Sequence, residues 1–275
     1  MKAVLSLQSQ VAGARVGNSV AVFAMERLGA EVVALPTTLL GRRPDLGAPG
    51  GGPIPVSVLA SLVEALDAGG TLARVGHVVT GYLASADQAD LVLDLVARIK
   101  DHNPRAVWVC DPVIGDAGRD FVKPEIADAI LRKLAPEADV LTPNHFEMER
   151  LAGRPLPTLM DVRDAAAALR KTVLVTSAPA PGAAALHVAP GSAWLVETPK
   201  LPHAPKGAGD LFTAIYVARR ALGQSVVMAL EAAAGATHDV IARSLLDGSP
   251  HLAIVAAQDK LEHPDTWPTA RPFTD

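Results

Sequence analysis

The most informative segment of this sequence is Lys206-Gly207-Ala208-Gly209-Asp210-Leu211-Phe212. Residues 201–205 before it are too rich in proline to be regular, whereas residues 211–222 are apolar enough to form a buried helix. A glycine turn is therefore expected to open directly onto a helix N-terminus. Free backbone N–H groups and the positive end of the helix dipole meet there, and both favour a bound anion.

Asp210 is the acidic residue inside that positive region. Its carboxylate is expected to stay ionised and to accept a proton beside a bound phosphate. The alternative is a plain loop followed by an aspartate near the helix cap, and the segment alone does not decide between the two. The rest of the chain must do so.

The bulk composition sets wide limits on what the chain can be. Its 275 residues suit one large α/β domain or two small ones, and an apolar fraction of 49% can form a sizeable core. Aromatic residues make up only 4%, which argues against a protein that stacks many nucleobases. A net charge of −4 gives no electrostatic reason to expect binding to nucleic acid or to an anionic membrane.

Cys110 is the single cysteine, so a disulfide within the chain is impossible, which fits a reducing compartment. The apolar run at residues 3–7 is too short for a signal peptide, and no stretch approaches the roughly 20 apolar residues of a membrane span. We therefore expect a cytoplasmic protein.

Predicted strands and helices alternate almost throughout the chain. We expect strands at residues 3–7, 31–35, 75–80, 106–110, 138–141 and 172–176, and a hairpin formed by residues 184–188 and 193–196. Helices are expected at residues 18–28, 56–66, 86–100, 124–134, 161–170, 211–222 and 226–243. This pattern predicts an α/β fold of three αβα layers, in which helices cover both faces of a mostly parallel central sheet. Without an evident linker, residues 1–275 are expected to form one domain.

Two segments stand apart from this alternation. Residues 36–55 contain five prolines and five glycines with Arg42 and Arg43 between them, and we expect them to be irregular. Such a segment is either a lid or substrate loop over a site or a flexible insertion. The proline-rich tail, residues 263–275, is expected to lie on the surface.

Polar residues gather where the predicted parallel strands end, which is where ligands bind in open α/β sheets. These residues are Ser9, Tyr82, Asp111, Asn144, Glu147, Thr176 and Ser177. Each has a structural alternative. The Asn144–Glu147 spacing fits a helix capping box as well as a water-mediated Mg²⁺ site. The Thr176–Ser177 pair can bind phosphate or simply cap a turn, and Tyr82 can stack on a ring or pack in the core.

Taken together, these stretches resemble the ribokinase-like superfamily and, within it, the pyridoxal kinases. The resemblance covers nearly the whole chain. It rests on Gln8-Ser9 with Gly17-Asn18-Ser19, on residues 27–30, 81–87, 110–116, 141–147 and 206–210, and on residues 255–259.

The resemblance implies ATP-dependent phosphorylation of the 5′-hydroxymethyl group of pyridoxal, with Mg²⁺ and often a monovalent cation such as K⁺, by a homodimer. Carried over by position, Asp210 would be the base, and the backbone N–H groups of Gly207, Ala208 and Gly209 would hold the transferring phosphoryl group. Asp111 and Glu147 would organise Mg²⁺, mostly through water. The remaining implied contacts are Asn144, Thr176 and Ser177 along the ATP phosphates, and Ser9, Thr37 and Tyr82 around the pyridine ring.

The departures from the family pattern concern the substrate. Gln10 stands where the family usually has histidine, and residues 38–47 lack the family's polar and aromatic groups but contain Arg42 and Arg43. Ala208 replaces a common threonine and keeps the backbone donor. Two alternatives stay open: a kinase for another small alcohol, such as hydroxymethylpyrimidine or a sugar, and a catalytically silent protein that binds a vitamer or nucleotide.

Overall fold

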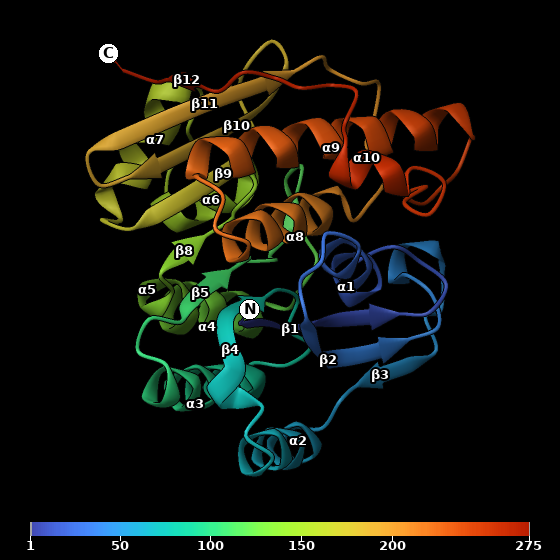
Figure 1. Cartoon of the computed structure of the whole chain (residues 1–275), viewed down its shortest axis with the longest axis vertical. Coiled ribbons are helices and arrows are strands. Elements are labelled where there is room, and N and C mark those ends of the chain that lie inside the picture. The colour runs from blue at the N-terminus through green and yellow to red at the C-terminus, as the bar shows by residue number, and fades with distance from the viewer. Residues whose placement is uncertain (1, 275) are drawn as a thin grey trace.

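A computed structural model describes residues 2–274 of the chain, and a single large sheet runs through them (Figure 1). Its ten strands lie in the order β12-β11-β10-β9-β8-β5-β4-β1-β2-β3. They are β1 (Ala3–Val11), β2 (Val32–Leu40), β3 (Gly51–Pro53), β4 (Val75–Thr80), β5 (Val107–Cys110), β8 (Val140–Leu141), β9 (Thr172–Ala178), β10 (Ala183–Ala189), β11 (Ser192–Thr198) and β12 (Arg271–Pro272). The neighbours from β2 through β9 pair in parallel, and the strands outside them pair antiparallel, so the predicted mostly parallel sheet is confirmed.

Helices cover both faces of this sheet, as predicted. One face is covered by α1 (Asn18–Arg27), α8 (Ala208–Ala221), α9 (Val226–Leu246) and α10 (Gln258–Glu262), which lie before the sheet in Figure 1. The other face is covered by α2 (Val56–Ala68), α3 (Asp87–His102), α4 (Pro124–Ala129), α5 (Ala135–Glu137), α6 (His145–Ala152) and α7 (Leu159–Ala168). A small hairpin, β6 (Gly115–Asp116) with β7 (Arg119–Asp120), stands outside the large sheet.

The two hydrophobic cores follow from the alternation of side chains along each strand. On β1, Leu5 and Leu7 face one core while Val4 faces the other. On β9, Val173 lies in the first core and Leu174 in the second. Because both faces are covered, residues 3–5 of β1 and 173–175 of β9 are apolar at every position, as parallel sheets require. Each such side chain stabilises the fold by about 1.5–3 kcal/mol when it is fully buried.

Segment 36–55 is more regular than predicted. β2 continues to Leu40, β3 pairs antiparallel with it, and residues 44–46 form a 3-10 turn. Pro36 is tolerated within β2 because the β1–β2 register shifts between Gln8 and Gln10, next to its own partner. The expectation of an irregular segment is therefore wrong for residues 36–40 and 51–53. The expectation holds for residues 41–50, the tip of the segment, except for the 3-10 turn at residues 44–46.

The predicted surface tail also contributes to the fold. Ala270 is buried and its N–H donates to Glu231 Oε1 at 2.8 Å. Residues 271–272 then pair with Trp194 and Leu195 of β11. The surface expectation is thus wrong for Ala270, whereas Arg271 and Pro272 stay exposed although they pair with the edge of β11. Asp275 and Met1 lie outside the described residues.

The helix predicted at residues 124–134 reaches Glu137 through a π-helical turn, Ile130–Leu134. Pro136 has no N–H group and cannot donate a helical hydrogen bond. The wider π-helical turn lies just before this proline. Among residues 2–274, no helix combines the length and the hydropathy that a membrane crossing needs.

Candidate active site

The turn before α8 is built on Gly207. This residue has φ of 99°, and a Cβ atom there would stand 2.0 Å from the carbonyl oxygen of Arg15. Only glycine permits both the left-handed conformation and this close approach. The turn consequently packs directly on the loop between β1 and α1.

That loop holds the Asp210 carboxylate, which accepts a hydrogen bond from the Gly17 N–H at 2.8 Å. Gly17 itself has φ of 53°, and a Cβ atom there would stand 2.3 Å from Ser9 Oγ. Burial raises the pKa of Asp210 to about 6, although the hydrogen bond from Gly17 acts to lower it. The carboxylate is therefore largely ionised at neutral pH and can take up a proton at little cost.

A cavity of about 210 Å³ lies between the α8 turn and the ends of the parallel strands. It brings together nine residues that the sequence nominated for catalysis, metal binding or ATP binding. They are Asp111, Asn144, Glu147, Thr176, Ser177, Gly207, Ala208, Gly209 and Asp210. Their placement in one cavity favours a functional interpretation of the glycine turn over a plain loop, and their roles there stay predictions.

Glu147 and Asn144 form the capping box that their spacing suggested. Asn144 Oδ1 accepts from the Glu147 N–H, and Glu147 Oε2 accepts from the Asn144 N–H, both at 2.9 Å. Glu147 Oε1 also accepts from the N–H groups of Ile114 and Gly115 at 3.0 and 3.3 Å. Burial nevertheless raises the pKa of Glu147 to about 7. The Glu147 carboxylate therefore caps the N-terminus of α6 and also lines the cavity.

Asp111 is also buried, and its pKa is raised well above the ordinary value by burial and by the charges of Glu147 and Asp210. In the same cavity, Thr142 Oγ1 is buried and has no hydrogen-bond partner within residues 2–274. No group of three or more acidic, histidine or cysteine side chains in that range could hold a metal directly. A hydrated divalent ion fits better, because Mg²⁺ keeps most of its waters and needs only one or two carboxylates.

Ser177 stands at an irregularity in β9. The register against β10 steps from Ala178 to Thr176 while β10 advances by one residue, and Ser177 is the extra residue with φ of 54°. Such a bulge turns a side chain that would otherwise follow the pleat, and strained residues of this kind concentrate at functional sites. Within the described residues, the hydroxyls of Thr176 and Ser177 have no protein partner in any hydrogen bond.

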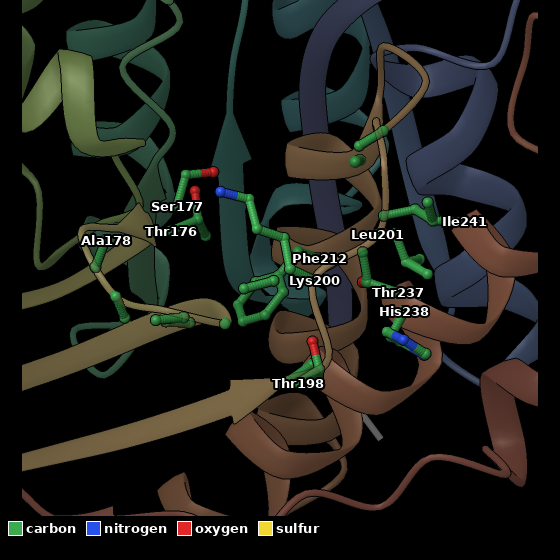
Figure 2. A pocket seen from close by; sticks show the side chains of 18 of the residues that line it. Thr176, Ser177, Ala178, Thr198, Lys200, Leu201, Phe212, Thr237, His238 and Ile241 are labelled. Atoms are coloured by element: carbon green, nitrogen blue, oxygen red, sulfur yellow. The ribbon is translucent and has the colours of Figure 1, made fainter.

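A second cavity, of about 400 Å³, adjoins the first and shares Thr176, Ser177, Ala204, Ala208 and Gly209 with it (Figure 2). Its walls come from β9, β10, the segment after β11, α8 and α9, and are mainly apolar. The residues labelled in Figure 2 include Ala178, Thr198, Lys200, Leu201, Phe212, Thr237, His238 and Ile241. Sequence analysis nominated Thr176, Ser177, Ala208 and Gly209, but it missed this cavity because most of the other lining residues share no motif or spacing.

The three residues nominated for the pyridine ring line neither cavity. Ser9 adjoins Gly17 and so lies close to the Asp210 loop. Thr37 is fully buried and its Oγ1 donates to the Tyr82 carbonyl oxygen at 2.7 Å. Tyr82 is half-buried against the core. Thr37 thus supports the backbone at Tyr82, and direct contact of either residue with a substrate stays a prediction.

Two buried amides that sequence analysis did not nominate organise this end of the sheet. Gln88 Nε2 donates to the carbonyl oxygens of Thr37 and Ile54, while its Oε1 accepts from the Ala84 N–H. Asn18 Oδ1 accepts from Ser6 Oγ at 2.7 Å. Both residues lie in the first turn of a helix that follows a parallel strand, and an amide side chain at that place is the signal that could have identified them.

The tip of segment 36–55 is internally paired. Arg43 forms an ion pair with Asp45 at 2.6 Å, and Arg42 Nε donates to the Ala48 carbonyl oxygen at 2.8 Å. Arg43 lowers the pKa of Asp45, and Lys206 adds to that effect, which puts the tip within electrostatic range of the α8 turn.

Comparison with known proteins identifies the family. The family described as phosphomethylpyrimidine kinase matches residues 51–254. Pyridoxal kinase PdxY of Paraburkholderia xenovorans is 38% identical over 277 residues, covering 97% of this chain and 96% of the relative. The chain belongs to the pyridoxal kinase family.

Solved structures from this family share the fold over the full length. Pyridoxal kinase from Leishmania donovani in complex with ADP and pyridoxine is 29% identical with a TM-score of 0.90, covering 98% of this chain and 99% of that one. Pyridoxal kinase of Entamoeba histolytica with PLP is 23% identical with a TM-score of 0.92, and the alignment covers 100% of both chains. The predicted resemblance and the ribokinase-like fold are confirmed.

Proposed function

We propose that this protein transfers the terminal phosphoryl group of ATP to the 5′-hydroxymethyl group of pyridoxal. The observation that carries the proposal is the single cavity that joins Asp210, the α8 N-terminus and two buried carboxylates, beside a larger apolar cavity suited to a nucleoside. Relatives named as pyridoxal kinases, 34–38% identical over nearly the whole chain, support the same activity.

In this proposal, Asp210 accepts the proton of the substrate hydroxyl as its oxygen attacks the terminal phosphorus of ATP. The phosphorus–oxygen bond to ADP breaks, and ADP leaves with the bonding electron pair. The backbone N–H groups of residues 207–209 lie at the N-terminus of α8, which is the positive end of the helix dipole. They stabilise the negative charge on the transferring phosphoryl group. Gly17 holds the Asp210 carboxylate in the orientation for proton transfer.

We further propose that Asp111 and Glu147 hold Mg²⁺ through water. The ion would neutralise charge on the phosphates when it is bound. Burial raises the pKa of both carboxylates, and the charge of Glu147 further raises the pKa of Asp111, so a cation that relieves this repulsion fits the site.

Without a divalent ion, we expect the thermal stability that these carboxylates contribute to fall as pH rises. Glu147 binds a proton more tightly in the folded chain, at a pKa of about 7 against an ordinary 4.5. Its contribution is therefore fully present below the lower value and lost as pH rises through the higher one. Mg²⁺ should restore stability at neutral pH more than at acidic pH, which melting temperatures with and without MgCl₂ between about pH 5 and 8 would show.

Glu147→Gln is the matched variant for this measurement. It removes the charge and keeps a side chain suited to the capping box. We expect it to flatten the pH dependence and to shrink the effect of Mg²⁺. An unchanged Mg²⁺ effect in the variant would contradict the assignment of Glu147.

The activity itself is tested by ADP release over pyridoxal, pyridoxine, pyridoxamine, hydroxymethylpyrimidine and ribose. We expect the highest kcat/KM with pyridoxal. Hydroxymethylpyrimidine is the second candidate, because the matching family is described as phosphomethylpyrimidine kinase. Turnover of that alcohol alone would overturn the pyridoxal assignment, and no turnover with any acceptor would favour a silent binding protein.

We also propose a cytoplasmic homodimer of single-domain subunits. One sheet that includes both Ala3 and Pro272 supports the single domain. Val58 and Leu62 lie one turn apart on α2 with exposed side chains, an apolar strip of the kind that subunit interfaces bury. Sedimentation velocity would test the dimer, and a monomer at micromolar concentration would contradict it.

A further inference from the structure

A lysine, Lys200, lies near the junction between the two cavities, and neither the sequence motifs nor the fold explains its position. Lys200 follows β11 and lines the larger cavity. Figure 2 shows its side chain extending along the cavity toward Thr176 and Ser177, the two residues whose hydroxyls border both cavities. Lys200 is an exposed residue, so its ammonium group borders the cavity and stays open to solvent.

No carboxylate in residues 2–274 forms an ion pair with Lys200. The nearest acid along the chain, Glu197, is paired with Arg271 at 3.2 Å. Without a protein counter-ion in that range, the ammonium group at the edge of the cavity is free to pair with a ligand that carries negative charge.

The other groups at the junction favour the same ligand. Thr176 and Ser177 offer hydroxyl donors without protein partners, and the Ser177 bulge directs one of them. The N-terminus of α8 adds the backbone donors of Ala208 and Gly209, which line both cavities. Donors and a cation meet here, while the buried acids Asp111 and Glu147 line only the smaller cavity. This arrangement of hydrogen-bond donors and a positive charge suits a polyphosphate that runs from one cavity into the other.

We propose that Lys200 binds the phosphate chain of the nucleotide where it passes from the larger cavity into the smaller one. The lysine thereby sets the affinity for the phosphates and leaves the affinity for the nucleoside unchanged. It also stabilises the charge that ADP gains when the phosphorus–oxygen bond breaks. This inference rests on the proposed function for the nucleotide but not for the acceptor alcohol.

Lys200→Gln tests the proposal by calorimetric binding of ADP, AMP and adenosine, without any acceptor. We expect the affinity for ADP to fall about tenfold, as for loss of one charge-assisted hydrogen bond, and adenosine to bind within about twofold of wild type. Lys200→Arg should recover most of the ADP affinity. Lys133→Gln, a surface lysine paired with Asp90 on the opposite face of the sheet, is the charge-matched control and should change nothing.

Steady-state kinetics give a second readout. In Lys200→Gln the KM for ATP should rise about tenfold, whereas the KM for the acceptor should stay near wild type. ADP affinity within twofold of wild type would overturn the proposal. Equal losses for ADP and adenosine would also overturn it, because the residue would then only shape the cavity. If wild type binds ADP through Lys200 but does not phosphorylate pyridoxal, the proposed acceptor fails and the Lys200 assignment stands.

Discussion

Asp210→Asn is expected to lower kcat by about 10²–10⁴-fold, the range that a positioned general base contributes. Asparagine keeps an oxygen that can accept from the Gly17 N–H, so the turn should keep its geometry. It also removes a charge whose burial raises the pKa of Asp210 to about 6, and the melting temperature should therefore stay equal or rise. Turnover with pyridoxal and ADP affinity, measured on the same preparation, separate chemistry from binding.

The control for this variant is Asp94→Asn on the exposed surface of α3, where the carboxylate pairs with Arg98. It makes the same chemical change away from the cavities and should leave kcat within about twofold, because surface ion pairs contribute little. Near-normal turnover in Asp210→Asn would remove Asp210 from the role of base. A parallel loss of ADP affinity would instead point to a damaged nucleotide site.

Gly207→Ala is expected to be the most damaging change in the glycine turn. The left-handed backbone at φ of 99° and the 2.0 Å approach to the Arg15 carbonyl oxygen leave no room for a methyl group. Backbone strain alone costs about 1–3 kcal/mol, and relief of the clash would move Asp210 away from Gly17. A misplacement near 1 Å can cost about 100-fold in rate, so kcat/KM should fall by at least that much.

Gly209→Ala is the matched variant, two residues further along the same turn. A Cβ atom at Gly209 would meet nothing within 4 Å, and its φ is not in the left-handed region. Chemical denaturation should therefore show a lower free energy of unfolding for Gly207→Ala and little change for Gly209→Ala. Equal stability of the two variants would show that the turn does not depend on the close approach at Gly207.

Sequence reasoning performed well where one local rule decides the outcome. Strands that are apolar on both faces could only be central, so their ends, and with them Asp111 and Glu147, converged in one cavity. The capping box of Asn144 and Glu147 was also readable, because its two hydrogen bonds depend on a spacing of three residues.

The errors arose where distant segments decide the outcome. Residues 36–40 extend β2 because β1 and β3 pair with them, which outweighs the local effect of Pro36. The tail pairs with β11 for a similar reason. The hydrogen bond from the Thr37 hydroxyl to the Tyr82 carbonyl oxygen, 45 residues away, was likewise beyond any local pattern, and the substrate contact of Thr37 stays a prediction. Lys200 was missed because its place in the sequence does not reveal that its side chain extends toward Thr176 and Ser177 (Figure 2).

The hydrogen bond between Gly17 and Asp210 joins residues 193 positions apart. Closing so long a loop costs entropy that is recovered only when both ends have packed. Every strand of the large sheet except β12 precedes Asp210 in the sequence, so these strands leave the ribosome before the residues that complete the candidate active centre. We therefore expect a chain that ends before residue 207 to lack the oriented base of the proposed reaction.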